Sequence, residues 1–185
     1  MVDSTHSQSQ YQVRFDWGVA GAADVGDGVD VTVWVDALEA VGAAASIDDL
    51  PGTVVTATLR NRSAVADWVL ARQAEKGDRF VVAIIAAGDT RADGSARVSV
   101  EDLLAAGAVI DALTERGIDH CSPEAAAASA AFAGLRSATR HLVGASGNGR
   151  AIAAAGRRDD VLHSAQLDAS TEVIARGNAR GDQHG

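Results

Sequence analysis

Side chains suited to binding a phosphate group or a divalent cation follow three apolar, β-branched runs of this chain. They are Asp36 at the end of run 29–36, Arg60 and Asn61 after run 53–59, and Gly88 and Asp89 after run 80–87. In an open parallel α/β sheet, ligands bind outside the carboxyl ends of the strands. We therefore expect these side chains to converge on one edge of a sheet.

The residue types indicate a site for a hard cation and an anion. Carboxylate oxygens are the ligands that Mg²⁺ prefers, and a guanidinium group matches phosphate, sulfonate or carboxylate oxygens. The candidate Mg²⁺ ligands are Asp36, Asp89, Glu101 and Asp102. Simpler interpretations stay open, because an Asp at a strand end often caps a turn and acidic residues in a first helical turn suit the helix dipole.

A glycine-rich segment, 146–150, is a second candidate for anion binding. Its small residues would let backbone N–H groups approach an anion, and Arg150 adds positive charge. It lacks the Lys-Ser/Thr ending of a P-loop, so an ordinary loop between helices is the alternative. The substrate-binding candidates are Arg60, Asn61, Gly88, Ser146 and Arg150, and the catalytic candidates are Asp36, Arg60 and Asn61.

The pattern of apolar residues predicts the elements that position these groups. Strands are expected over 29–36, 53–59 and 80–87, and helices over 37–46, 63–76, 99–116, 124–135 and 139–156, the last with a glycine-rich break. Ser63 and Ser99 are predicted N-caps. The alternation predicts an α/β fold, a single domain with a mainly parallel sheet flanked by helices. We assign residues 11–175 to the domain, 1–10 to a polar N-terminal tail and 176–185 to a polar C-terminal tail.

Composition restricts the class of partner. The 185 residues carry a formal net charge of −9, which disfavours long-range attraction to nucleic acid or to an anionic membrane. No apolar run approaches the ~20 residues of a membrane span. Cys121 is the only cysteine, so an internal disulfide is impossible and a cytoplasmic location is expected.

The order of short motifs resembles the ComB-like family, the 2-phosphosulfolactate phosphatases, over about residues 13–173. The similar segments are 59–66 (LRNRSAVA), 87–95 (AGDTRADGS), 100–110 (VEDLLAAGAVI), 146–150 and 159–170. The chain looks like a shortened and divergent member, with Asp89 where the family has Glu and a shorter section before residue 53. The resemblance implies an α/β fold and magnesium-dependent hydrolysis of a small anionic phosphate ester, a phosphorylated and sulfonated hydroxy acid.

Two functions are compatible with these residues. In a phosphatase, Asp36 with other carboxylates would hold Mg²⁺, while Arg60 and Arg150 would bind the phosphate or sulfonate. In a non-catalytic, small-ligand-binding or structural homologue the scaffold persists without the activity. Glu39 favours the second, because its carboxylate stands where the family has a hydroxyl or a cation. The shortened chain also predicts a homodimer that covers exposed apolar surface.

Overall fold

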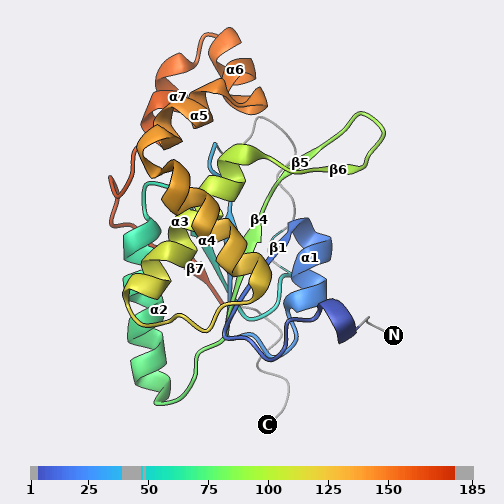
Figure 1. The fold of residues 1–185 in the computed structure, drawn as a ribbon, viewed down its shortest axis with the longest axis vertical. Coiled ribbons are helices and arrows are strands. Elements are labelled where there is room, and N and C mark those ends of the chain that lie inside the picture. Colours follow the sequence, from blue (N-terminus) through green and yellow to red (C-terminus); the bar gives the residue numbers. More distant parts are fainter. Residues whose placement is uncertain (1–3, 39–46, 48, 178–185) are drawn as a thin grey trace.

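A five-stranded sheet forms the centre of the chain in the computed structural model, which describes residues 4–38, 47 and 49–177 (Figure 1). The sheet order is β1-β4-β2-β3-β7. The strands are β1 (Val13–Trp17), β4 (Val82–Ala86), β2 (Val31–Val35), β3 (Thr53–Ala57) and β7 (Ala175–Arg176). The first four are parallel, and β7 pairs antiparallel with β3 at the edge. The prediction of an α/β fold with a mainly parallel sheet is confirmed.

The strands are apolar without alternation because helices cover both faces of the sheet. Every residue of β2 and β4 is buried. Their side chains divide between two cores, with Val33 and Ile84 in the larger and Trp34 and Ile85 in the smaller. The predicted strands extend one or two residues too far at their ends, where the chain leaves the sheet.

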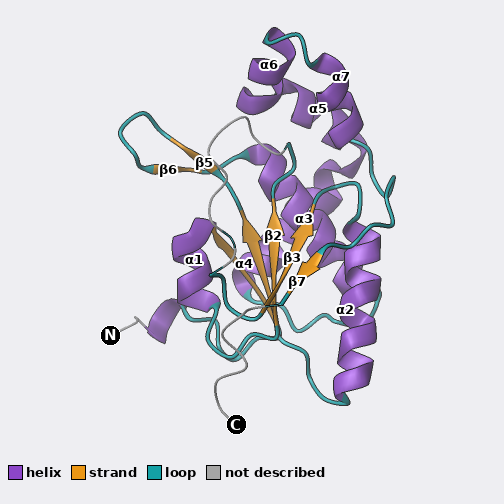
Figure 2. Cartoon of the chain, turned by 180° about the vertical axis from the view of Figure 1, so that it is seen from behind, coloured by secondary structure: helices purple, strands orange, loops and turns teal. Residues whose placement is uncertain are grey.

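Different helices cover the two faces (Figures 1 and 2). Helix α1 (Gly18–Val25) belongs to the smaller core and contacts β1 and β4. The larger core lies under α2 (Arg62–Lys76), α3 (Val100–Glu115) and α4 (Pro123–Leu135). Helix α1 was not predicted from the sequence, since two glycines within eight residues weaken its helix propensity.

A third group of helices lies beyond the carboxyl edge of the sheet, near the start of α3 (Figure 1). It comprises α5 (Thr139–Ala145), α6 (Gly147–Ala154) and α7 (Arg158–Ser164), joined to α4 by the 3₁₀ turn η2 (Arg136–Ala138). The predicted break within 139–156 is present at Ser146, whose hydroxyl accepts a hydrogen bond from Gly149 N–H at 3.0 Å and so caps α6. A Cβ at Gly149 would lie 2.1 Å from the Val143 carbonyl oxygen, so this tight turn requires glycine.

Two predicted N-caps differ from expectation. Asn61, not Ser63, occupies the N-cap of α2, and the Ser63 N–H donates to Asp168 Oδ1 at 3.1 Å from a distant part of the chain. Ser99 stands at the N-cap of α3, but its side chain makes no capping hydrogen bond. Local spacing could not reveal Asp168, because it is 105 residues away.

Three further segments complete the fold. Residues Ser4–His6 form the 3₁₀ turn η1, and the Gln8 side chain exchanges two 2.9 Å hydrogen bonds with the Phe15 backbone, so part of the predicted polar tail lies against β1. The predicted loop 89–98 contains a hairpin of β5 (Asp89–Thr90) and β6 (Ala96–Arg97). Glu39 and most of the predicted helix 37–46 lie outside the described residues, while 37–38 form a bend.

Candidate active site

The Asp102 carboxyl group joins the ends of two neighbouring strands. Its Oδ1 accepts from the Ala37 N–H at 2.8 Å and its Oδ2 accepts from the Gly88 N–H at 3.0 Å. Ala37 follows β2 and Gly88 follows β4, while Asp102 lies in the first turn of α3. The β5–β6 hairpin returns the chain to the sheet edge and so places α3 there. The ends of β2 and β4 and the start of α3 therefore lie together at this edge.

Burial changes the acidity of this group. Asp102 is only 3 % exposed, and this burial, with smaller contributions from the Asp36 and Glu101 carboxylates, raises its pKa from 3.8 to about 8. The two backbone N–H donors act in the opposite direction but do not compensate for the loss of water. Asp102 on its own therefore holds a proton at neutral pH, although it lies among groups that would favour a cation.

Asp36 lies beside Asp102 at the end of β2. Its backbone N–H donates to the Ala57 carbonyl at 3.3 Å, and its Oδ1 accepts from the Leu38 N–H at 3.3 Å. The half-buried side chain contributes to the electrostatic field at Asp102. Asp36 therefore both closes the turn after β2 and adds a carboxylate to the edge, so the two interpretations of this residue are compatible.

Glu101 connects the carboxylates to the glycine-rich segment. This buried side chain accepts a 2.8 Å hydrogen bond at Oε1 from Asn148 Nδ2. Segment 146–150 is thus held against the start of α3. The Ser146 hydroxyl, however, donates to the Val143 carbonyl at 2.8 Å and accepts from Gly149 N–H. These bonds make the segment a helix connection, the alternative weighed from the sequence, and leave Arg150 exposed on α6.

Arg60 and Asn61 lie after β3 and contact the C-terminal part of the chain. The Arg60 guanidinium donates to the His163 carbonyl at 3.0 Å and to Gln166 Oε1 at 2.7 Å. Asn61 Oδ1 accepts from Thr58 N–H at 2.8 Å, and its amide nitrogen donates to the Glu172 carbonyl at 3.0 Å. These contacts hold the turn after β3 against segment 163–172, so the predicted roles in substrate binding stay predictions.

Gly88 and Asp89 connect β4 to the hairpin. Gly88 has a φ of +68°, and a Cβ there would lie 2.8 Å from the Arg97 carbonyl oxygen, so the close approach of β6 requires glycine. Its N–H group is bound by Asp102. The exposed Asp89 begins β5, and its Oδ1 accepts from Thr90 N–H at 2.7 Å. Asp89 is therefore at the base of the hairpin, where its side chain binds the Thr90 N–H and not Asp102.

Ser99 is a site residue that the sequence did not single out beyond its position before α3. Its Oγ is buried and has no hydrogen-bond partner among the described residues. Leaving a buried hydroxyl unpaired costs about 1–3 kcal/mol, a cost that a bound ligand or water would remove. The only signal in the sequence was its position three residues before Asp102, which also suits an ordinary helix cap.

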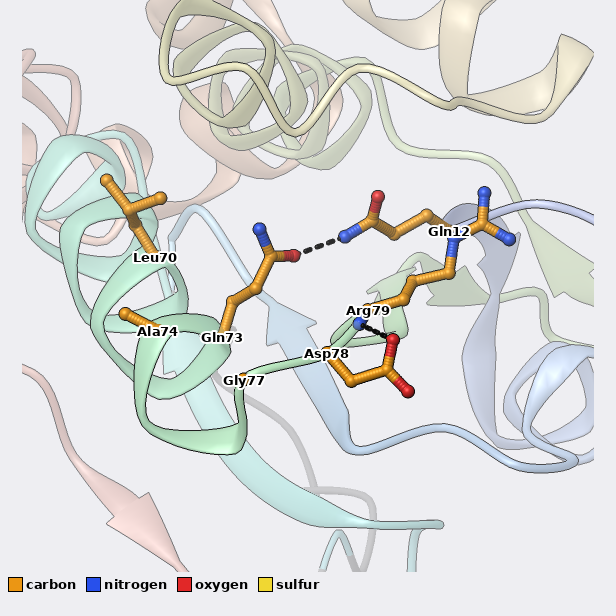
Figure 3. Close-up of a pocket in the computed structure, with 7 residues that line it drawn as sticks. All are labelled: Gln12, Leu70, Gln73, Ala74, Gly77, Asp78 and Arg79. Carbon is orange, nitrogen blue, oxygen red and sulfur yellow. Dashed lines mark hydrogen bonds between the residues drawn. The ribbon is translucent and has the colours of Figure 1, made fainter.

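A separate hollow lies at the opposite end of the sheet (Figure 3). It has a volume of about 440 Å³ and is lined by residues before β1 and β4 and by the end of α2, among them Gln12, Gln73 and Arg79. Gln12 Nε2 donates to Gln73 Oε1 at 2.5 Å across it. Because ligands of open parallel sheets bind at the carboxyl ends of the strands, we assign the candidate site to the Asp102 edge.

A family model described as 2-phosphosulpholactate phosphatase matches residues 32–178 of the chain. The chain belongs to this family. The match includes Asp36, Ser99, Glu101, Asp102 and Asn148, which lie at the end of β2, at the start of α3 and in α6. A comparison with curated proteins found no match. In the part of the chain that the structure describes, no helix is long and apolar enough to cross a membrane.

This member of the 2-phosphosulpholactate phosphatase family has oxygen donors for a divalent cation at the carboxyl edge. Within residues 4–38, 47 and 49–177, no group of three or more His, Cys, Asp or Glu side chains forms a ready metal centre. The edge nevertheless offers oxygen donors: the Asp36 and Asp102 carboxylates and the unpartnered Ser99 hydroxyl. Mg²⁺ commonly takes one or two carboxylates and completes its shell with waters and substrate phosphate. The donor set fits an ion held in that way.

Proposed function

We propose that the chain is a phosphatase that hydrolyses a small phosphorylated hydroxy acid at the carboxyl edge of β2 and β4. The supporting observation is the buried Asp102 carboxyl group, bound to the ends of both strands beside Asp36. A buried carboxyl group beside two others is unfavourable when all are charged. Such an arrangement is typical of functional sites, and the family to which the chain belongs is one of phosphatases.

Magnesium is the proposed cofactor. Asp36 and Asp102 are its ligands in this proposal, with Glu101 and Asp89 as the further carboxylates predicted from the sequence. Bound Mg²⁺ neutralises charge on the phosphoryl oxygens. The chain itself orients the ester: the Ser99 hydroxyl can donate to a phosphate oxygen, and Glu101 fixes Asn148 at the mouth of the site.

Arginines provide the attraction for the substrate anion. Arg60 lies after β3 and Arg150 lies two residues after Asn148, so both bring positive charge to the side of the sheet where the carboxylates gather. In a chain with a net charge of −9, such local charge is needed to hold a phosphate ester or a sulfonate. Asn61 is proposed as a hydrogen-bond donor beside Arg60, and its present contacts fix its position.

The test is hydrolysis of a panel of phosphate esters, including 2-phosphosulfolactate, with and without Mg²⁺. We expect Mg²⁺-dependent release of phosphate, and Asp36→Asn should lower kcat/KM by about 100-fold because it removes a charge that holds the cation. Asp78→Asn is the matched control, since Asp78 lines the hollow at the opposite end of the sheet, and it should leave the rate unchanged.

Inactivity on the whole panel at all Mg²⁺ concentrations would contradict the proposal and favour the alternative, a non-catalytic ligand-binding or structural homologue. Glu39, which motivated that alternative, lies outside the described residues.

We also infer a homodimer from exposed apolar side chains such as Val19 and Val98, which are 48 % and 62 % exposed. Sedimentation of a monomer at tens of micromolar (an order-of-magnitude choice) would count against it. A cytoplasmic location stays a prediction, which fractionation of the source cells would check.

A further inference from the structure

A cationic pocket lies between α5, α6 and α7, outside the carboxylate site. Its volume is about 560 Å³, within the range of small-molecule pockets. The charged and titratable residues that line it are Arg140, His141, Arg150 and Arg158. The lining contains no Asp or Glu, although acidic residues outnumber basic ones in the chain by 25 to 16.

The three arginines lack the ion pairs that other arginines in this region form. Within the part of the chain that the structure describes, the side chains of Arg140, Arg150 and Arg158 form no hydrogen bond or ion pair. Arg157, adjacent in sequence, pairs with Asp160 at 2.6 Å. Guanidinium groups stay protonated at every physiological pH, so the pocket gathers like charges that repel one another. An anion would remove that repulsion.

The remaining lining defines what else the ligand needs. Val161 and Leu162 from α7 and Ala145 and Ala153 from the neighbouring helices provide apolar and small surface between the charges. Three guanidinium groups from three helices match the oxygens of phosphate, sulfonate or carboxylate groups at more than one position. A single small anion would leave most of this volume and charge unused.

We propose that this pocket binds a small organic molecule that carries two or more phosphate, sulfonate or carboxylate groups. The pocket lies outside the Asp102 edge and does not depend on the proposed phosphatase activity, although Arg150, proposed above to attract the phosphatase substrate, also lines it. The two sites are connected through α6, because Asn148 donates to Glu101 at 2.8 Å while Gly149 and Arg150 line the pocket.

Calorimetric titration with inorganic pyrophosphate, without divalent metal, tests the proposal on the full chain. We expect saturable binding that weakens as salt is added. Arg140→Gln combined with Arg158→Gln should raise Kd at least about tenfold, since two charge-assisted contacts are lost. Arg157→Gln is the matched control, because Arg157 does not line the pocket, and its Kd should equal that of the unchanged chain.

Binding must also be separated from the carboxylate site. Asp36→Asn should leave the Kd for pyrophosphate unchanged, whatever its effect on hydrolysis. The proposal would be overturned by no binding at millimolar pyrophosphate (an order-of-magnitude limit for a specific site), by an unchanged Kd in the double arginine variant, or by loss of binding in Asp36→Asn. Because Arg140 and Arg158 are exposed, we expect thermal melting to show that the double variant is folded.

Discussion

Asp102 contributes to the fold and to the candidate site through the same two oxygens. They accept the backbone N–H groups of Ala37 and Gly88, which would otherwise lack partners where the chain leaves β2 and β4. Carboxylate oxygens are strong acceptors, but burial among other acidic groups opposes their charge. A residue chosen only to cap strand ends would not need a negative charge in this position. The conflict between these requirements is a reason to assign a function to Asp102.

At the residue scale, we predict that stability falls with rising pH because of Asp102. Its pKa is about 8 in the native chain and 3.8 ordinarily. Between these values the native state retains a proton that the unfolded state has lost, so the free energy of unfolding decreases as pH rises. The contribution is complete below pH 3.8 and is lost through pH 8, with a slope of at most about 1.4 kcal/mol per pH unit.

Urea unfolding across this pH window, without divalent metal, measures the effect. Asp102→Asn should flatten the dependence, although one strand-end N–H then faces an amide donor and overall stability falls. The difference between the two chains is the relevant quantity, because it isolates the contribution of residue 102. The same slope in both would show that Asp102 is already charged in the native state.

At the scale of elements, the close packing of α3 on α4 depends on small residues. A Cβ at Gly107 in α3 would lie 2.2 Å from the Ala128 carbonyl oxygen in α4. Phe132, which is fully buried, packs in the same contact. Alanine and glycine let the two backbones approach, and this agrees with the low aromatic content of 4 %.

We predict that Gly107→Ala destabilises the chain by roughly 1–3 kcal/mol, because the helices must move apart. Gly134→Ala in α4 is the matched control: apart from its chain neighbours and the backbone of its own helix, no described atom lies within 4 Å of the added Cβ, so higher helix propensity should stabilise the chain by up to about 1 kcal/mol. Chemical denaturation of both variants gives the comparison. A neutral Gly107→Ala would show that the α3–α4 contact can adjust without cost.

At the scale of the whole molecule, Arg62 connects four parts of the chain. Its guanidinium pairs with Asp111 of α3 at 3.1 Å and with Asp168 after α7 at 3.0 Å, and it lies 5.4 Å from the centre of the Phe132 ring of α4. The Arg62 side chain is 4 % exposed. The Arg62–Asp168 ion pair thereby holds the segment after α7 against the start of α2, next to the turn that contains Arg60 and Asn61.

Arg62→Ala should lower the free energy of unfolding by about 1–3 kcal/mol, because two partly exposed carboxylates lose a charged hydrogen-bond partner, while Asp111 keeps Arg136 at 3.6 Å. Arg157→Ala breaks an exposed pair with Asp160 and should change stability by less than about 1 kcal/mol. Denaturant unfolding measures both. Equal effects would mean that water replaces Arg62 without loss, and that the segment after α7 is held by other contacts.

The sequence by itself determined the elements whose signal is local. Apolar runs predicted β2, β3 and β4 to within two residues, and the helix predicted over 124–135 is α4, which begins one residue earlier, where the Ser122 hydroxyl accepts from Ala125 N–H. The order of strand ends also predicted that the turns after β2 and β4 reach one edge, where Asp102 binds both. These features follow from period, caps and the geometry of parallel strands, each readable within a short window.

Only the tertiary structure decided how individual polar groups are used. Arg60 and Asn61 looked like an anion clamp, yet they contact residues more than 100 positions away. Three other features join separate segments in the same way: the ion pair of Arg62 with Asp168, the hydrogen bond from Asn148 to Glu101, and the pocket of arginines from three helices. Such partners have no fixed spacing, because they depend on where the folded core brings each segment. For this physical reason, composition and periodicity could predict where the carboxyl edge of the sheet lies, but they could not predict which partner each polar side chain binds there.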